Sequence, residues 1–300
     1  MSNRKRRFPF MQVDAFTNTP LGGNPCAILF DTDELDEGTM LAIAKEMNLS
    51  ETAFVRRSQV ADFSARYFTP AEEIPLAGHP TIATVFALVE SRRLELTSEH
   101  QKMTLELKDG PIEVEIISQG GNIEQIVMNQ RKPQFLTRHS PEEIFPVFNL
   151  SIEDLLPGAV IQTVSTGTPQ LMIPLKNLDA LKRAAVDIPA YTALRASSDF
   201  FSPHLFVLGG VTEKGDVFAR HFGVPPDTPE DPFTGSATGG MAAYLWHYGL
   251  VDSPKLVVEQ GHWMNRPGIG FAEVVGPPKD IQSVRVGGSA VTVLTGEFHF

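Results

Sequence analysis

The chain has 300 residues, of which 42% are hydrophobic and 20% are charged, and its formal net charge at pH 7 is -11. This composition is ordinary for a soluble globular protein with room for two lobes, and it excludes disordered and fibrous classes. A surface of this charge repels polyanions, so we expect neither nucleic acid nor a membrane as partner and favour a small molecule.

Targeting and redox features are sparse. The basic run at residues 4–7 is followed by neither the apolar stretch nor the cleavage site of a signal peptide, and no run of about 18 apolar residues occurs. We therefore expect a flexible tail over residues 1–10 and a cytoplasmic protein. Cys26 is the single cysteine, which excludes an internal disulfide, a thiolate metal cluster and any mechanism with two thiols in one chain.

The first half alternates short strands with two helices. Apolar runs bounded by Gly and Pro predict adjacent, antiparallel strands at 11–16 and 26–30. An amphipathic pattern predicts a helix over 35–47 that ends at Asn48. Strands follow at 52–55 and 62–68, then a helix at 81–90 that is too apolar for the surface and belongs in the middle of its lobe. Three further strands are predicted at 103–107, 112–117 and 123–128.

The second half repeats this order after a helix-rich, proline-containing stretch that reaches about residue 156. Strands are predicted at 160–165, 171–175, 205–208, 216–222, 272–275, 283–287 and 291–297, with helices at 178–185 and 237–248. We therefore expect two lobes, residues 1–135 and 136–300, with a terminal strand that can pair with the first lobe.

One segment occurs twice. Residues 73–81 (EIPLAGHPT) reappear as residues 230–238 (EDPFTGSAT), with Glu, Pro, Gly and Thr at identical places. Upstream, residues 62–68 and 216–222 share Asp, Ala, Arg and Phe. Such a duplication predicts that the ligand binds in a cleft between the halves.

Each copy ends at the predicted start of an apolar helix, at Gly78-His79-Pro80 and at Gly235-Ser236-Ala237. Pro80 suits the first helical position. The free N–H groups and the positive dipole end of such helices favour an anion, so two of them predict a site for a small carboxylate-bearing ligand. The alternative is that these residues merely cap buried helices.

Several other chemistries are disfavoured. Neither copy has the Gly-Lys-Ser/Thr ending of a phosphate loop. Ser236 lacks the Gly-x-Ser-x-Gly pattern of a hydrolase nucleophile, because Thr234 stands where Gly is needed. The histidines at 79, 221, 247 and 262 show no metal-binding spacing, so we predict no metal.

The catalyst should lie where the two halves differ, since a symmetric shell only holds the ligand. His79 stands opposite Ser236, and Asp231 stands opposite Ile74. Glu51 begins an apolar strand, where partial desolvation favours a carboxylate that takes and returns a proton near neutral pH. The alternative is that Glu51 is an exposed surface residue.

Six motifs carry a family resemblance. Residues 13–17 (VDAFT), 23–25 (GNP), 48–54 (NLSETAF), 77–81 (AGHPT), 230–237 (EDPFTGSA) and 259–267 (EQGHWMNRP) together resemble the PhzF family of phenazine-biosynthesis isomerases. The resemblance covers nearly the whole chain. It implies an α+β, diaminopimelate epimerase-like fold, with two pseudo-symmetric lobes whose curved, mostly antiparallel sheets wrap a buried helix, and a homodimer.

The resemblance also assigns roles. In diaminopimelate epimerase a cysteine precedes each repeated Gly, and here those positions hold Ala77 and Thr234. Two-thiol epimerisation is therefore excluded, while proton transfer by a carboxylate remains. The resemblance implies that Glu51 is the general acid/base and needs no cofactor, and it implies substrate contacts for Ser50, Gly78, His79, Asp231, Gly235 and Ser236.

The sequence thus predicts a cofactor-independent isomerase that moves a proton on a small carboxylate-bearing, unsaturated cyclic metabolite. Two alternatives stay open. One is a racemase or epimerase of an amino-acid-like substrate that pairs Glu51 with Asp231 or His79. The other is a catalytically silent metabolite-binding or interaction protein.

Overall fold

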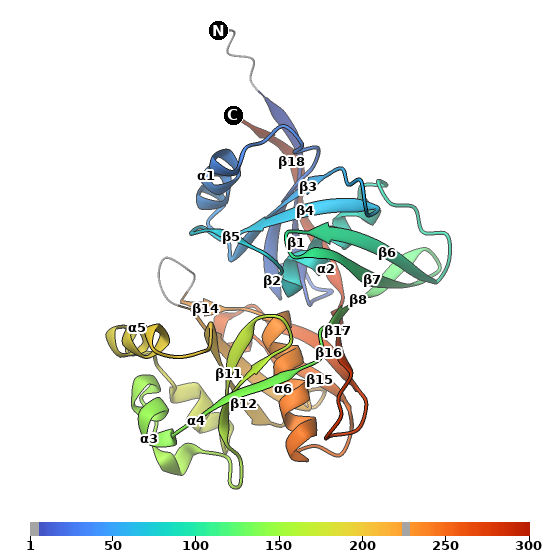
Figure 1. Cartoon of the computed structure of the whole chain (residues 1–300). Helices are drawn as coiled ribbons and strands as arrows, with labels where there is room; N and C mark the ends of the chain where they lie inside the picture. The colour runs from blue at the N-terminus through green and yellow to red at the C-terminus, as the bar shows by residue number, and fades with distance from the viewer. Residues whose placement is uncertain (1–5, 224–228) are drawn as a thin grey trace. The chain divides into compact units, whose positions relative to one another are not determined.

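The computed structural model describes residues 6–223 and 229–300, and the chain divides into two compact units (Figure 1). The first unit runs to Met128 and also includes Gly287–Phe300, and the second is Asn129–Val286. The sequence placed the boundary at residue 135, whereas the structure places it after Met128. The C-terminal segment belongs to the first unit because its last strand pairs with the first strand of the chain.

The first unit is built from nine strands and two helices in the described residues, and the last two residues of one of these strands, β8, pass into the second unit. They are β1 (Arg7–Ala15), β2 (Asn24–Leu29), α1 (Glu37–Met47), β3 (Glu51–Arg56), β4 (Phe63–Phe68), β5 (Glu73–Ile74), α2 (Gly78–Glu90), β6 (His100–Leu107), β7 (Gly110–Gln119), β8 (Asn122–Gln130) and β18 (Ala290–His299).

The second unit contains the remaining elements. They are β9 (Gln134–His139), α3 (Pro141–Ile144), the 3-10 turns η1 (Phe145–Phe148) and η2 (Ile152–Asp154), β10 (Ile161–Ser165), β11 (Pro169–Pro174), α4 (Leu178–Arg183), α5 (Ile188–Ala196), β12 (Ser202–Leu208), β13 (Val217–Phe222), β14 (Glu230–Asp231), α6 (Gly235–Tyr248), β15 (Lys255–Gln260), η3 (His262–Met264), β16 (Gly268–Val275) and β17 (Ser283–Gly288), whose last two residues return to the first unit.

The strand pairing repeats between the units. In the first, β1–β2 is antiparallel, β2–β3 parallel, β3–β4 and β4–β5 antiparallel, and β4–β6 parallel. In the second, β10–β11, β11–β12, β12–β13, β13–β14 and β13–β15 follow with the same directions in the same order. The duplication seen in the sequence is therefore a duplication of topology.

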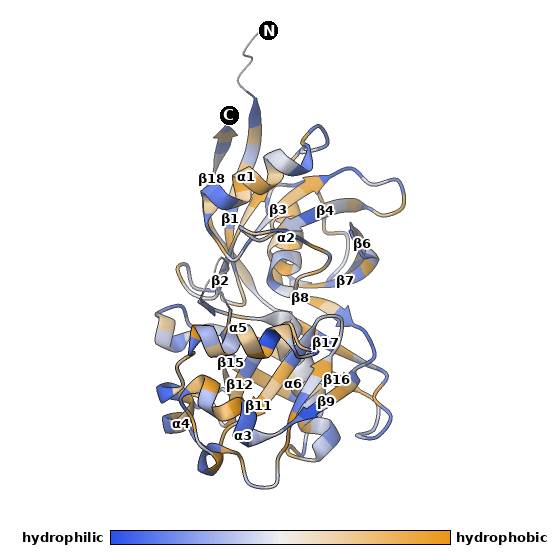
Figure 2. Ribbon diagram, turned by 60° about the vertical axis from the view of Figure 1, so that its left-hand side comes forward, coloured by the Kyte–Doolittle hydropathy of each residue, from blue (hydrophilic) through white to orange (hydrophobic). Residues whose placement is uncertain are grey.

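A buried helix lies at the centre of each unit. Every residue from Gly78 to Leu88 of α2 is buried, and the helix packs against β1, β2, β3 and β18. Helix α6 packs against β10, β11 and β16, and Figure 2 shows apolar colouring along α6 and the adjoining β11 and β12. A helix without a polar face must be enclosed in this way. This arrangement confirms the predicted fold class.

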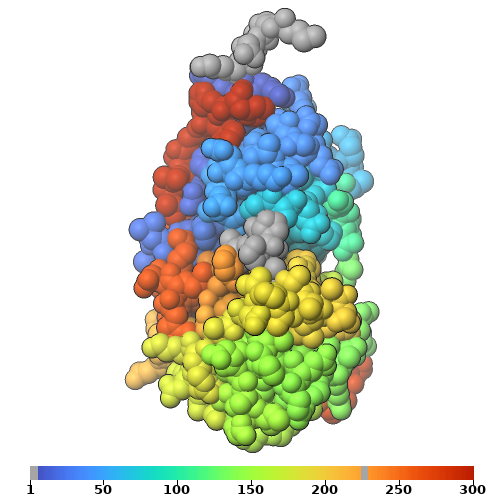
Figure 3. Space-filling view, turned by 90° about the vertical axis from the view of Figure 1, so that its left-hand side faces the viewer, coloured from blue at the N-terminus to red at the C-terminus, as the bar shows by residue number. Residues whose placement is uncertain are grey.

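The outer helices cover the far sides of the sheets. In α1, Met40, Ile43 and Ala44 pack against Phe54 and other apolar residues of the first sheet. In the second unit the segment from α3 to α5 covers a separate apolar cluster, and Figure 3 shows that segment facing the viewer in green and yellow. These helices shield the sheet face that does not contact the central helix.

Three details differ from the sequence predictions. Residues 7–10, predicted as tail, belong to β1, because Arg7–Ala15 pairs with β18 and buries Phe8; residues 1–5 lie outside the described residues. Helix α2 begins at Gly78, so Pro80 is its third residue, still in the first turn where no N–H is needed. Strand β9, helix α5 and strand β15 were not predicted.

In the part of the chain described, no helix is long and apolar enough to cross a membrane.

Candidate active site

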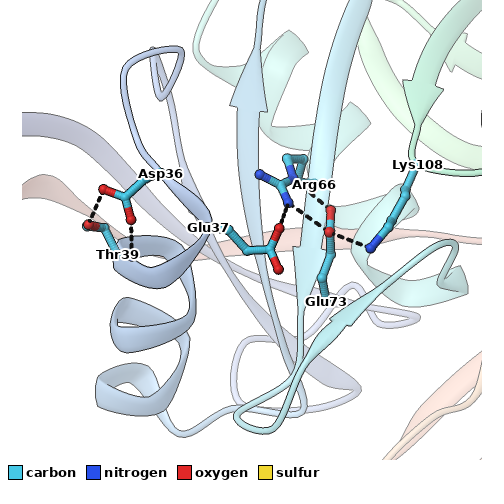
Figure 4. A network of polar contacts seen from close by, with 6 residues as sticks. All are labelled: Asp36, Glu37, Thr39, Arg66, Glu73 and Lys108. Atoms are coloured by element: carbon cyan, nitrogen blue, oxygen red, sulfur yellow. Dashed lines mark hydrogen bonds and ion pairs between the residues drawn. The ribbon is translucent and has the colours of Figure 1, made fainter.

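The Arg, Glu and Thr side chains that the two copies share are scaffold. Arg66 donates two hydrogen bonds of 2.7 Å to Glu73, and Figure 4 shows it between Glu73 and Glu37, with Lys108 on the far side of Glu73. Arg220 makes the same two-pronged contact with Glu230 at 2.8 Å. In both units this pair fixes the strand and turn that lead to the central helix.

The shared Thr also has the same structural role in both units. Thr81 Oγ1 donates to the carbonyl of Ala77 at 2.7 Å, and Thr238 Oγ1 donates to the carbonyl of Thr234 at 3.0 Å. Each hydroxyl therefore ties the first turn of its helix to the N-cap residue. These shared side chains hold the backbone, which leaves the chemistry to the residues that differ and to the N–H groups at the helix starts.

Both central helices begin without a side-chain cap. The N-cap residues Ala77 and Thr234 make no capping hydrogen bond to the helix, whereas Asp36, Asn177 and Asp187 each accept one at the starts of α1, α4 and α5. His79 and Ser236 are the second residues of their helices, so the capping alternative is wrong for them. The first-turn N–H groups of α2 and α6 keep the anion-binding character of an uncapped helix start.

In the first unit the structure brings Glu51 and His79 together. Glu51 is the first residue of β3 and its side chain is 17% exposed, while the His79 side chain is 4% exposed. Glu51 Oε2 lies 3.1 Å from His79 Nε2. The exposed-surface alternative for Glu51 is therefore wrong. Ser50 directly precedes the strand, and Gly78 is the first residue of α2.

Burial keeps His79 neutral. Desolvation lowers the pKa of His79 to about 3, so the contact with Glu51 at pH 7 joins a neutral imidazole to a carboxyl group and is no salt bridge. Asn24 Nδ2 lies 3.0 Å from His79 Nδ1. With the amide donating to Nδ1, the ring carries its proton on Nε2, which is the nitrogen that faces Glu51. Sequence reasoning missed Asn24, although it lies in the Gly-Asn-Pro motif.

The single cysteine stands beside this pair. Cys26 on β2 is the register partner of Glu51 on β3, and its side chain is fully buried. Burial, and then the negative charge of Glu51, raise the pKa of the Cys26 thiol. Because the thiolate is the reactive form, Cys26 at neutral pH is an inert packing residue.

In the second unit the predicted residues gather at the junction of β14 and α6. Asp231 ends β14, and Gly235 and Ser236 open α6. Thr234 Oγ1 donates to Asp231 Oδ2 at 2.6 Å, and the buried Gln260 bonds both residues. Gln260 was missed by sequence reasoning, although it lies in the Glu-Gln-Gly-His motif, where two polar residues end an apolar strand.

The described residues contain no cluster of three or more His, Cys, Asp or Glu side chains placed to bind a metal ion. Within each unit, what the site offers is one carboxyl group with a polar partner beside the uncapped start of a buried helix. Such an arrangement can bind an anionic group and transfer a proton.

Comparison with known proteins agrees with the geometry. The family model of the phenazine biosynthesis-like proteins, PhzC-PhzF, matches residues 13–296. The uncharacterized isomerase YfhB of Bacillus subtilis is 34% identical over 260 residues, which cover 86% of this chain and 87% of that protein. Trans-2,3-dihydro-3-hydroxyanthranilate isomerase of Pseudomonas fluorescens is 31% identical over 287 residues, which cover 94% of this chain and 96% of that protein.

Solved structures extend the comparison to the fold. The phenazine biosynthesis protein of the PhzF family from Bacillus anthracis superposes with a TM-score of 0.86 at 34% identity, covering 98% of this chain and 99% of that one. A hydroxyproline epimerase from Agrobacterium vitis shares the fold alone, with a TM-score of 0.66 at 12% identity. The chain therefore belongs to the PhzC-PhzF family of phenazine biosynthesis-like proteins and is an isomerase.

Proposed function

We propose that this isomerase moves a proton between two carbons of a small, carboxylate-bearing, unsaturated cyclic metabolite, with Glu51 as the general acid/base. The observation that carries the proposal is the 3.1 Å contact between Glu51 Oε2 and His79 Nε2 on a mostly buried carboxyl group. A partly desolvated carboxylate is a stronger base than a solvated one, and a neutral imidazole beside it does not neutralise its charge.

The proposed step is balanced within the substrate. Glu51 takes a proton from one carbon, the electron pair of that C–H bond shifts through the conjugated system, and the protonated Glu51 returns the proton to another carbon. No redox partner or cofactor takes part in this proposal. His79 Nε2 lies 3.1 Å from the Glu51 carboxyl group and keeps a neutral ring against it. The residues Ser50, Gly78, Asp231, Gly235 and Ser236 are proposed as substrate contacts.

The substrate class rests on the relatives. Two of them are named trans-2,3-dihydro-3-hydroxyanthranilate isomerase. The compound in that name is an unsaturated cyclic amino acid. Ala77 and Thr234 at the positions preceding the repeated Gly, together with the buried thiol of Cys26, leave this chain without a thiol pair. A carboxylate shuttle is the remaining acid/base.

The test is proton exchange. The enzyme is incubated in deuterium oxide with trans-2,3-dihydro-3-hydroxyanthranilate and with a panel of small unsaturated carboxylic acids, and NMR follows label uptake and product. Glu51→Gln should keep the fold and lose label uptake by at least about a hundredfold, in the range for general acid/base groups. Glu46→Gln, on the exposed face of α1, is the matched control. If the Glu51→Gln variant retained label uptake, Glu51 would not be the general acid/base.

A further inference from the structure

Thr234 forms part of a directional hydrogen-bond chain. The buried Gln260 side chain donates from Nε2 to the Asp231 carbonyl at 2.7 Å and to Thr234 Oγ1 at 3.2 Å, and its Oε1 accepts from Thr234 N at 3.2 Å. Thr234 Oγ1 then donates to Asp231 Oδ2 at 2.6 Å. Since Gln260 is 0% exposed, its amide is held in one orientation.

The direction of the chain follows from its donors. The amide nitrogen of Gln260 can only donate, so Thr234 Oγ1 accepts from it and turns its own proton elsewhere. A carboxylate oxygen can only accept, so that proton points at Asp231 Oδ2. A hydrogen bond to an ionised group is short and strong, which fits the distance of 2.6 Å.

The first unit lacks both members of this pair. The residues that correspond to Asp231 and Thr234 are Ile74 and Ala77, since 231 - 74 = 157 and 234 - 77 = 157. Neither of those side chains can donate or accept a hydrogen bond. The hydroxyl therefore occurs only in the copy that carries the acid, although the scaffold contacts of the two copies match.

We propose that Thr234 is a positioning residue, which fixes the orientation of the Asp231 carboxylate and is itself fixed by Gln260. This inference rests on the proposed function only in so far as Asp231 contacts the substrate. A carboxylate with one oxygen held has lost the freedom to rotate before the ligand arrives, so binding does not have to supply that ordering.

The variants are Thr234→Val, which removes the hydroxyl at nearly constant shape, Thr234→Ser, which restores it, Asp231→Asn, and the double variant Thr234→Val with Asp231→Asn. Thermal unfolding shows that each is folded. The first readout needs no substrate: the carboxyl ¹³C resonance of Asp231, assigned through its loss in Asp231→Asn. It should move in Thr234→Val and return to its original place in Thr234→Ser.

The second readout is KM for trans-2,3-dihydro-3-hydroxyanthranilate. We expect Thr234→Val to raise KM roughly tenfold or more, as for a hydrogen bond to a charged group, and to have no further effect in the Asp231→Asn background. The role of Thr234 would be overturned if the Asp231 resonance did not move in Thr234→Val. It would also be overturned if Thr234→Val raised KM equally in the unmodified enzyme and in the Asp231→Asn variant. Absence of turnover by the unmodified enzyme counts against the proposed function and leaves the resonance to decide for Thr234.

Discussion

Asn24 Nδ2 lies 3.0 Å from Nδ1 of His79, on the side of the ring away from Glu51. This contact decides which nitrogen of a neutral, buried imidazole carries the proton, and so whether the ring offers Glu51 a donor or a lone pair. The first unit therefore holds an ordered series from Asn24 through His79 to Glu51. The second holds another, from Gln260 through Thr234 to Asp231.

Asn24→Asp should move the proton of the neutral His79 ring from Nε2 to Nδ1. A carboxylate at this position can only accept, so it draws the ring proton to Nδ1 and leaves Nε2 as an acceptor facing Glu51. We expect the ¹⁵N shifts of the two His79 nitrogens to exchange character, and turnover to fall about tenfold to a hundredfold. Asn122→Asp, on an exposed strand position, is the matched control. Unchanged ¹⁵N shifts would refute the tautomer assignment.

Arg66→Met should reduce stability without a direct effect on chemistry. The Glu73 side chain is 3% exposed, and the hydrogen bonds from Arg66 hold the pKa of this carboxyl below its ordinary value. Removing Arg66 leaves a nearly buried carboxylate with Lys108 alone. We expect a loss of about 2–3 kcal/mol in the free energy of unfolding, somewhat below the value for fully buried pairs because Lys108 remains.

The comparison for that change is Lys102→Met. Lys102 is 63% exposed in its pair with Glu113, and such surface pairs contribute little, so we expect a change within about 0.5 kcal/mol. Urea unfolding of both variants measures the difference. Equal losses in the two variants would show that the Arg66–Glu73 pair is no more than a surface contact.

Much of this fold could be read from the sequence because its signals are local. Continuous apolar runs identified α2 and α6 as buried helices, and the repeated motif located the two helix starts. Other elements depend on tertiary partners. Strand β15 ends in Glu259 and Gln260, which are polar yet 0% exposed because the loop at Val211 and Thr212 and the turn at Thr234 supply their hydrogen bonds. No pattern in a single sequence reports such partners.

The site shows the same division. Glu51 and His79 were named from motifs, and the structure places them in contact. Asn24 and Gln260 act only through the residues they touch, and their partners lie 55 and 26 or more residues away along the chain. Positioning residues of this kind become visible only when distances are known.

Stability should fall as the pH drops below 6.5. Burial lowers the pKa of His79 and of His221 to about 3, and burial, followed by the proximity of His221, lowers that of His204 well below its ordinary value. The ordinary value is 6.5, so below it the unfolded chain binds protons that the folded chain does not. The contribution of these neutral rings to the free energy of unfolding is complete above pH 6.5 and is lost progressively towards about pH 3.

Each of these histidines contributes at most about 1.4 kcal/mol per pH unit in that window. Urea unfolding at pH 7.5, 6.5, 5.5 and 4.5 measures how steeply the free energy of unfolding changes with pH. His79→Gln should reduce this slope by the amount that corresponds to about one bound proton. A free energy of unfolding that stays constant from pH 7.5 to pH 4.5 would contradict the buried neutral state of all three rings.

Two adjacent glycines of α6 give the sharpest packing test. A Cβ atom added at Gly239 would meet Gln130 Oε1 at 1.8 Å, and the Gln130 amide is engaged, because it donates to the Gly235 carbonyl at 2.9 Å and accepts from Thr166 at 2.6 Å. A Cβ atom at Gly240 would come closest to the flexible end of Met172, at 2.8 Å, and would lie at ordinary van der Waals distance from Val164. Gly239→Ala must therefore displace the side chain that holds the first turn of α6, whereas Gly240→Ala asks a thioether to rotate.

We expect Gly239→Ala to lower the free energy of unfolding by about 1–3 kcal/mol, the usual cost of overpacking, and to raise KM by disturbing the helix start at Gly235 and Ser236. Gly240→Ala should lower the free energy of unfolding by less than about 1 kcal/mol, because the higher helix propensity of alanine offsets part of the cost of the contact with Met172. Thermal unfolding and KM for the two variants are compared directly. A Gly240→Ala variant as damaged as Gly239→Ala would mean that close packing along the whole of α6, and not the Gln130 contact, holds the helix start in place.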